Sequence, residues 1–216
     1  MPQMPGTYQY FSETDFHSTS HRFGAVSHCD TRFAPKQQPD DDEIRHTLKA
    51  LLESYVSTMS KLNVNTWLAH GPLIGWYWNR KLLPWDTDID VHVSGEGIAY
   101  LAQSFNMTEY SYPVPPGQTA RTYLLDINPH YSIVSEKDVA NKIDARWIDT
   151  TNGKFIDMTA VHRNTRESDG GSQPGTLFCK DGHRYKVLIA SIKYRLGTET
   201  KVATGRRCIP VAAINF

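Results

Sequence analysis

The sequence is poor in cysteine, in net charge and in long apolar runs. Its 216 residues include only three cysteines, and Cys29, Cys179 and Cys208 form no Cys-x-x-Cys pair. This count argues against a disulfide scaffold and against a cysteine-rich zinc site. No run approaches 18 apolar residues, and the N-terminus lacks a basic-then-apolar signal pattern, so we expect no transmembrane segment in this chain.

The net charge is also absent, because 23 Lys and Arg balance 23 Asp and Glu. A sequence-independent nucleic-acid binder depends on a global positive field, so nucleic acid is not an expected partner. The balance is uneven along the chain: from Cys179 onward there are eight Lys and Arg against two Asp and Glu. The body is therefore mildly acidic and the tail is basic.

What is present indicates a packed globular protein. Hydrophobic residues make up 39% and aromatic residues 11% of the chain, which is enough to build a core despite a mean hydropathy of −0.48. We divide the chain into an extended N-terminal lead-in at 1–39, a main domain at 40–186 and a basic tail at 187–216.

Helical and strand patterns alternate through the main domain. Apolar residues at helical spacing follow an acidic cluster, and strands follow with period-two patterns. The predicted helices cover 42–61 and 95–104, and the predicted strands cover 66–69, 88–93, 122–127, 145–150 and 154–161. The fold class is therefore α/β (α+β), with a small mixed sheet flanked by helices.

Asn152-Gly153 separates the last two predicted strands and is typical of a two-residue type I′ turn. With that turn, Arg146 faces Thr159 and lies diagonal to Asp157. Arg146 and Asp157 then share one face of the hairpin.

Three carboxylates stand two residues apart at Asp86, Asp88 and Asp90. On a strand, neighbours of this spacing lie on one face about 7 Å apart and repel each other. The pattern favours a cation, and oxygen ligands suit Mg²⁺ or Mn²⁺; a solvated acidic edge is the alternative. An EF-hand loop is excluded, because its sixth and twelfth positions hold Val91 and Gly97 instead of Gly and Glu.

A further acid, Asp157, lies between apolar residues on a predicted strand, where Asp is disfavoured. Its partner is either Arg146 or a metal ion shared with the earlier acids. Strand acids beside a glycine-bearing turn compose a site for phosphoryl transfer, in which metal ions bridge phosphate oxygens. A helix N-terminus after Gly71 would receive a phosphate.

The segments HGPLIGW at 70–76 and LPWDTDIDV at 83–91 closely resemble the LicD family, which includes fukutin and the fukutin-related protein. NPHY at 128–131, DARWID at 144–149 and HCDTRF at 28–33 are similar to the fungal branch related to the yeast mannosylphosphate-transfer protein. The resemblance covers roughly residues 26–186 and implies a nucleotidyltransferase fold.

The resemblance implies a function and its site. Asp88 and Asp90 match the family's paired acids and Asp157 its third acid, so Mg²⁺ or Mn²⁺ ligation is expected there, with Asp86 as an additional or substitute ligand. Asp157 is either a ligand or the base for the acceptor hydroxyl. The implied reaction transfers a phosphorylated sugar from a nucleotide-diphosphate donor to a glycan, and for the fungal branch this is mannose 1-phosphate from GDP-mannose.

Two alternatives stay open at this stage. One is a non-catalytic relative that binds a sugar nucleotide or assists a separate transferase, and the other is an ordinary metal-dependent glycosyltransferase. Family members usually act in the Golgi, so a secretory location is implied by resemblance alone.

Substrate phosphates have several candidate contacts, each with a plainer explanation. The glycine turn corresponds to Gly71 and Gly75. The candidate cations are Arg80, Lys81, Arg121 and Arg146, which are alternatively solvated charges or, for Arg146, the neutralising partner of Asp157. Trp76, Trp78 and Trp85 are candidates for stacking on a base or a sugar, or for packing in the core.

Two features depart from the family. Pro72 stands where the family usually has Ser or Thr, which removes a hydroxyl and a backbone N–H from a phosphate cradle. The tail beyond about residue 187 no longer resembles the family, so we expect a truncated or altered C-terminal portion.

Overall fold

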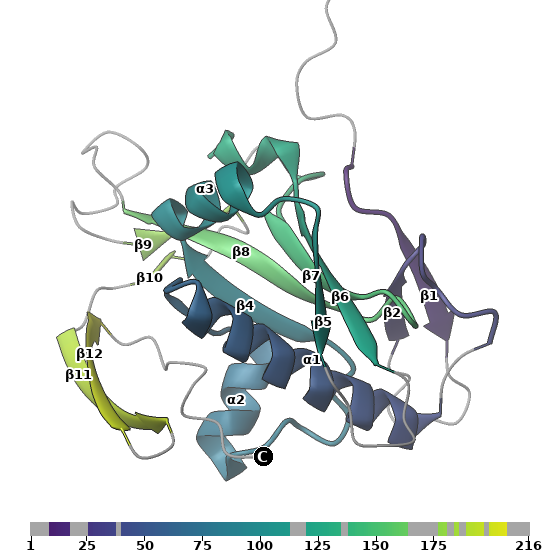
Figure 1. Cartoon of the computed structure of the whole chain (residues 1–216), viewed down its shortest axis with the longest axis horizontal. Helices are drawn as coiled ribbons and strands as arrows, with labels where there is room; N and C mark the ends of the chain where they lie inside the picture. The colour runs from purple at the N-terminus through teal and green to yellow at the C-terminus, as the bar shows by residue number, and fades with distance from the viewer. Residues whose placement is uncertain are drawn as a thin grey trace, which may run out of the picture.

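A mixed β-sheet forms the centre of the computed structural model, with α1 lying across one of its faces (Figure 1). The structure describes residues 9–17, 26–37, 40–112, 120–134, 138–163, 177–180, 184–185, 189–196 and 199–206. The predicted α+β class, a mixed sheet flanked by helices, is confirmed.

The helices are α1 (Asp41–Lys61), α2 (His70–Asn79), α3 (Gly95–Ser104) and the short 3-10 helix η1 (Pro129–Ser132). The first strands are β1 (Glu13–His17), β2 (Val26–Asp30), β3 (Thr66–Leu68), β4 (Ile89–Ser94), β5 (Thr108–Tyr112) and β6 (Arg121–Ile127). The remaining strands are β7 (Ala145–Asp149), β8 (Phe155–Arg163), β9 (Leu177–Phe178), β10 (Arg184–Tyr185), β11 (Ile189–Leu196) and β12 (Glu199–Arg206).

The main sheet has eight strands in the order β10-β9-β8-β7-β6-β5, with β4 and β3 added beside β8. The pairing of β4 with β8 is parallel, and every other pairing in this sheet is antiparallel. β4 and β8 come from segments more than 60 residues apart, so this parallel pair joins the two acid-bearing parts of the sequence.

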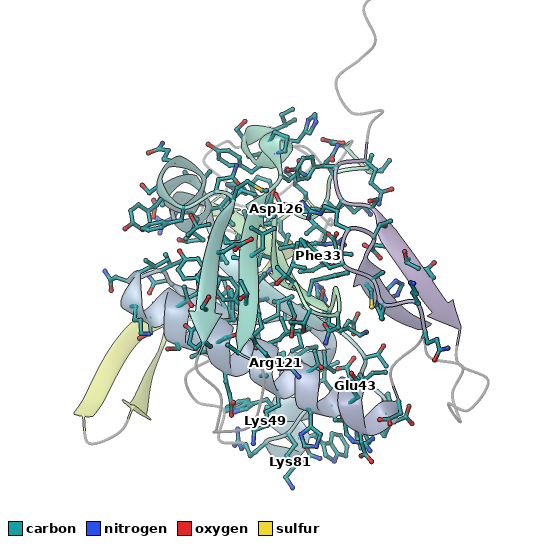
Figure 2. All side chains as sticks on the ribbon, turned by 45° about the vertical axis from the view of Figure 1, so that its right-hand side comes forward. Phe33, Glu43, Lys49, Lys81, Arg121 and Asp126 are labelled. Atoms are coloured by element: carbon teal, nitrogen blue, oxygen red, sulfur yellow. The ribbon has the colours of Figure 1, made fainter. Side chains whose placement is uncertain are left out.

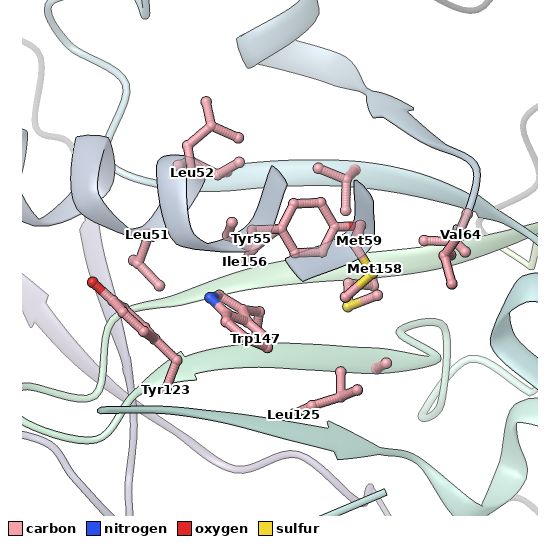
Figure 3. Packing of buried hydrophobic residues seen from close by; sticks show 14 of the residues in the cluster. Leu51, Leu52, Tyr55, Met59, Val64, Tyr123, Leu125, Trp147, Ile156 and Met158 are labelled. Atoms are coloured by element: carbon pink, nitrogen blue, oxygen red, sulfur yellow. The ribbon is translucent and has the colours of Figure 1, made fainter. Parts of the chain in front are cut away.

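The helix predicted at 42–61 is confirmed as α1. Asp40 caps it, because its side chain accepts a hydrogen bond from the Glu43 backbone N–H at 2.8 Å. The apolar stripe of α1 then packs on the sheet, where Tyr55 lies edge-on to Trp147 at 6.3 Å between ring centres (Figure 3). This layer is the hydrophobic core.

The helix predicted at 95–104 is likewise confirmed as α3, with Ser94 Oγ accepting from the Gly97 backbone N–H at 3.0 Å. The alternation predicted in β4 is also present: Ile89, Val91 and Val93 are buried against the core. Asp90 therefore points to the opposite face of the sheet from α1.

The predicted two-residue turn at Asn152-Gly153 is wrong. Asp149 and Lys154 close a four-residue loop, with the Asp149 N–H donating to the Lys154 carbonyl at 2.7 Å. Gly153 has φ +73°, but Asn152 does not have positive φ, so the type I′ geometry is not formed. The Asp149 carboxylate favours the wider loop, because it accepts from the Thr151 backbone N–H at 2.9 Å.

Part of the N-terminal lead-in forms the antiparallel hairpin β1–β2 (Figure 1). The residues after β2 pack on the sheet face opposite α1, where Phe33 joins a small cluster of Leu124, Ile148 and Phe155. Asp30 donates its backbone N–H to the Gly153 carbonyl at 2.8 Å, so the hairpin is fastened to the β7–β8 loop.

Among the described residues, Cys29 and Cys179 are buried and are not disulfide-bonded, and Cys208 lies outside the described part of the chain. Within the basic tail, β11 and β12 form a separate two-stranded sheet. No helix in the described ranges combines the length and apolar character needed to span a bilayer.

Candidate functional site

The two acids from distant segments meet on the parallel strand pair. Asp90 of β4 and Asp157 of β8 are register partners, and both occupy the face opposite α1. The alternation that buries Ile89 and Val91 is what turns Asp90 outward. The structure thus brings together the second strand acid and the third acid, and the metal ion expected between them stays a prediction.

A transverse row of charge crosses four strands at this level. Register pairs link Asp126 of β6 to Arg146 of β7, Arg146 to Asp157 of β8, and Asp157 to Asp90 of β4. Arg146 is therefore the single cation of a row that contains three carboxylates. The prediction that Arg146 faces Thr159 is wrong, because the wider β7–β8 loop shifts the register by two residues and places Arg146 directly opposite Asp157.

Arg146 is 1% exposed and binds two acids. Its Nε donates to Asp157 Oδ1 at 2.8 Å, and its terminal nitrogen bonds to Glu13 of β1. The guanidinium also lies over the Phe155 ring, 3.7 Å from the ring centre. Burial raises the pKa of Asp157 to about 6, although the Arg146 charge and hydrogen bond lower it.

Asp86 and Asp88 precede β4 on a turn. The Asp86 backbone N–H donates to the Leu83 carbonyl at 3.0 Å, and Asp88 is exposed just before the strand begins. Burial raises the pKa of Asp86 to about 7, with further increases from a hydrogen bond to Asp88 and from the charges of Asp88 and Asp90. The carboxylates are therefore close enough to hinder one another's ionisation.

The arrangement fits a divalent cation. Asp86 Oδ2 is buried and accepts no hydrogen bond within the described part of the chain. A carboxylate that is desolvated beside other carboxylates lacks the compensation that a cation supplies. Because all these donors are carboxylate oxygens, the set suits Mg²⁺ or Mn²⁺.

Lys154 belongs to this site, and the sequence analysis missed it. Its side chain is buried, and Nζ donates a hydrogen bond to the Thr87 carbonyl at 3.1 Å. Thr87 is the residue between Asp86 and Asp88 in the sequence. Burial lowers the pKa of Lys154, opposed by the nearby Cys29 and Asp88. A lysine directly after a loop glycine resembles any exposed turn lysine, so no signal in the sequence identified it.

Gly71 lies in the first turn of α2, which begins at His70 and not after Gly71, as the sequence suggested. A Cβ on Gly71 would stand 2.6 Å from Asp86 Oδ2, so the missing side chain allows the carboxylate to approach the helix N-terminus. Ala69 provides no side-chain cap there. Pro72 is accommodated in this first turn, where a backbone N–H has no helical partner.

Gly75 serves packing along α2. A Cβ there would stand 2.6 Å from the Lys81 carbonyl oxygen and 3.0 Å from the Leu83 nitrogen, so the segment after the helix folds back against it. Its role as a phosphate contact stays a prediction.

Arg80 and Lys81 lie at the other end of α2. Arg80 is the left-handed C-cap and stacks on Trp76, with 4.1 Å between the guanidinium carbon and the ring centre. Lys81 follows on the segment that folds back along the helix, with its carbonyl oxygen beside Gly75. The role of Arg80 and Lys81 as phosphate contacts stays a prediction.

Arg121 lies on the opposite face of the sheet. Its guanidinium pairs with the buried Asp149 at 2.6 Å and points towards Thr47 of α1. Figure 2 shows Arg121 beside α1, with Lys81 at the bottom of the view and Asp126 higher up near Phe33. Arg121 therefore stabilises the β7–β8 loop and is not grouped with the acids.

A second group of ligand-type side chains lies on the N-terminal hairpin. Atoms of Glu13, Asp15 and His28 lie within 4.8 Å of one another. His28 Nδ1 is 3.1 Å from Glu13 Oε2 and 3.0 Å from Asp15 Oδ1, so contacts of the imidazole with the two carboxylates account for the group. These residues are far apart from the sheet acids in sequence, and the sequence analysis did not identify them.

Comparison with known families identifies the domain that carries the sheet acids. A sequence profile described as LicD/FKTN/FKRP, nucleotidyltransferase domain, matches residues 63–167. The matched range contains α2, β4 and β8, and therefore every one of the four candidate acids.

Three known proteins illustrate the relationship. Mannosyltransferase regulator 14 of Saccharomyces cerevisiae is 26% identical over 197 residues, which cover 86% of this chain and 20% of that protein. Mannosyltransferase regulator 4 of the same yeast is 29% identical over 122 residues, which cover 56% of this chain and 10% of that protein. Human ribitol-5-phosphate transferase FKTN is 30% identical over 95 residues, which cover 42% of this chain and 20% of that protein. The chain thus spans a fifth or less of the length of these curated relatives.

Proposed function

Because residues 63–167 match the profile of the LicD/FKTN/FKRP nucleotidyltransferase domain, we propose that this chain carries out divalent-metal-dependent transfer of a phosphorylated sugar. The donor is a nucleotide-diphosphate sugar and the acceptor is a hydroxyl of a glycan. The relatives support this reaction class, since one is named a ribitol-5-phosphate transferase and two are named mannosyltransferase regulators.

The observation that carries the proposal is the convergence of carboxylates at the start of the β4–β8 pair. Asp90 and Asp157 are register partners, and Asp86 is close enough to Asp88 and Asp90 for their charges to raise its pKa. Such repulsion destabilises a protein unless a cation offsets it. The buried and unbonded Asp86 Oδ2 supports the same conclusion.

Asp88 and Asp90 are assigned as metal ligands, with Asp86 as an additional ligand. A bound Mg²⁺ or Mn²⁺ supplies charge neutralisation at the donor's phosphate oxygens. Arg146 holds Asp157 in place through Oδ1. Asp157 then acts as a ligand or accepts the proton of the acceptor hydroxyl, a role suited to a pKa of about 6.

The proposed donor is GDP-mannose. The acceptor oxygen attacks the phosphorus next to the sugar, the bond between the two phosphates breaks, and GMP leaves while mannose phosphate joins the acceptor. The names of the two yeast relatives support mannose as the sugar. A glycoprotein glycan as acceptor and a Golgi location are parts of the same proposal.

A second function is favoured by those same names. The yeast relatives are called regulators, and Pro72 leaves one fewer N–H at the α2 N-terminus. In this case the chain binds a sugar nucleotide or assists a separate transferase without catalysing the reaction.

Nucleotide release distinguishes the candidates. The purified chain is incubated with Mn²⁺ or Mg²⁺, GDP-mannose and an oligomannose acceptor, beside the Asp88→Asn variant. Acceptor-dependent GMP release that Asp88→Asn abolishes supports phosphosugar transfer. Release of GDP indicates an ordinary glycosyltransferase instead, and donor binding with no product indicates the non-catalytic function.

A further inference from the structure

The outer side of α2 exposes large apolar side chains. Trp78 is 82% exposed, Tyr77 is 72% exposed and Ile74 is 57% exposed. These residues are spaced i, i+3 and i+4, so they lie together on one face of the helix. Trp85, at 54% exposed, follows on the segment after the helix. We refer to Ile74, Tyr77, Trp78 and Trp85 as the aromatic face.

Core packing does not explain this face. The helix already buries Pro72 and Gly75, and Leu73 and Trp76 pack partly against the core. A helix that is apolar all round is normally buried. Exposed clusters of this kind on a soluble domain mark interaction surfaces.

The aromatic face lies on the helix whose N-terminus approaches the acidic site. Gly71 contacts Asp86, and four residues later Gly75 contacts Lys81 and Leu83. The segment 81–86 therefore runs antiparallel to α2, from the end of the helix back to its start. Trp85 adjoins Asp86 at the acidic end, and Trp78 lies near the far end.

The charged residues on α2 and on the segment up to Trp85 have one sign. No acidic residue occurs from His70 through Trp85, whereas Arg80 and Lys81 stand at the far end. The Arg80 guanidinium stacks on Trp76, so its position is defined. The surface thus combines flat aromatic rings with cations and suits a neutral or anionic partner.

We propose that the aromatic face binds the acceptor glycan, resting on the proposed function for the acidic site. A pyranose ring has an apolar C–H face that stacks on Trp and Tyr, while its hydroxyl groups remain in water. The acceptor must extend away from the acids where its terminal hydroxyl reacts, and the aromatic face is the surface leading away from them. Arg80 and Lys81 then contact phosphate groups already present on the glycan, rather than the donor's phosphates.

Binding is tested apart from catalysis. The affinity of the full chain for a fluorescently labelled oligomannose is measured by polarisation, without donor or metal. We expect Trp78→Ala and Tyr77→Ala to weaken binding by roughly tenfold or more, as for aromatic residues that dominate an interface. Tyr100→Ala on α3 is the matched control, because this tyrosine is also exposed, at 44%, and it should bind like the unmodified chain.

Three readouts separate this inference from the proposed function. Asp88→Asn should bind the oligomannose normally, and Trp78→Ala should retain its thermal stabilisation by Mn²⁺.

Glycan binding that depends on Trp78, without any transfer of phosphosugar, supports the glycan surface and overturns the proposed function. Transfer that is unaffected by Trp78→Ala and Tyr77→Ala, or no oligomannose binding, overturns the glycan surface. A change from dimer to monomer in Trp78→Ala, with glycan binding unchanged, would assign the face to self-association and also overturn it.

Discussion

Arg146 on β7 lies directly opposite Asp157 on β8, and its Nε bonds one oxygen of that carboxylate at 2.8 Å. Arg146 is also bonded to Glu13 from β1. The guanidinium therefore links the N-terminal hairpin to the acid that we place at the reaction centre.

Replacing Arg146 tests this link. In Arg146→Met the partly buried Asp157 loses the cation that bonds it, and we expect a loss of about 3 kcal/mol in the free energy of unfolding. The matched variant Glu13→Gln keeps the arginine bonded to Asp157 and should cost only about 1 kcal/mol. Urea unfolding of both variants measures the difference, and equal losses would contradict the assignment.

Removing one of the repelling acids should affect metal binding and stability in opposite directions. In metal-free protein, we expect Asp88→Asn to leave the melting temperature unchanged or higher, because a repulsive charge is removed from an exposed position. The rise in melting temperature on adding Mn²⁺ should disappear. Glu109→Gln on β5 removes another exposed acid and serves as control. Unfolding of Asp88→Asn would exclude the ligand role.

Stability should depend on pH through Asp86. Its pKa is raised to about 7, so the folded state retains a proton that the unfolded chain releases near pH 4. This contribution is present in full below about pH 4 and is lost as the pH rises through 7. The metal-free chain should therefore lose stability relative to Asp86→Asn between pH 4 and 8.

Divalent cations should reverse this trend, because they bind the ionised carboxylates. The stabilisation of the unmodified chain by Mn²⁺ should be larger at pH 8 than at pH 5.5. Asp157, with its pKa of about 6, adds to this difference because it ionises between these two pH values. Thermal unfolding across this range gives both measurements. A Mn²⁺ effect that is independent of pH would contradict ligation by these acids.

The two glycines of α2 should respond differently to alanine. In Gly71→Ala the new Cβ meets a carboxylate oxygen, Asp86 Oδ2, whose side chain is able to rotate away. We expect a stability change within about 1 kcal/mol, since alanine also favours the helix, together with weaker Mn²⁺ binding. In Gly75→Ala the Cβ meets backbone atoms of Lys81 and Leu83, so a loss of about 1–3 kcal/mol is expected.

The measurements for this pair are urea unfolding and Mn²⁺ titration. The reverse pattern, a stable Gly75→Ala and a Gly71→Ala that binds Mn²⁺ normally, would show that the α2 N-terminus does not position Asp86.

Sequence patterns predicted the elements with a strong local signal. The acidic cap and apolar spacing of α1, and the alternation that turns Asp90 outward on β4, are encoded by neighbouring residues. The β7–β8 register was not predictable in this way, because the side chain of Asp149 stabilises a loop that Asn152-Gly153 alone does not indicate. Local patterns therefore identified the acids but misplaced Arg146 relative to Asp157.

Contacts between distant segments account for the other differences. Glu13 reaches Arg146 across 133 positions of sequence, and Lys154 reaches the Thr87 carbonyl across 67. Neither pairing leaves a local pattern. Arg121 was equally ambiguous, because only the fold shows that it pairs with Asp149 on the α1 face.

Gly153 provides a test of the contact between the N-terminal hairpin and the domain. Its φ of +73° disfavours a side chain, and a Cβ would stand 2.9 Å from the Asp30 carbonyl oxygen and 3.0 Å from the Ala34 nitrogen. We therefore expect Gly153→Ala to cost about 1–3 kcal/mol in stability and to release the hairpin from the β7–β8 loop. Limited proteolysis should then cleave near residues 30–34 faster than in the unmodified chain.

Gly97→Ala is the control, since its Cβ meets only side-chain atoms at 3.0 Å or more, and cleavage near residues 30–34 should stay at the unmodified rate. Equal cleavage rates in Gly153→Ala and the unmodified chain would show that this close approach does not hold the hairpin in place.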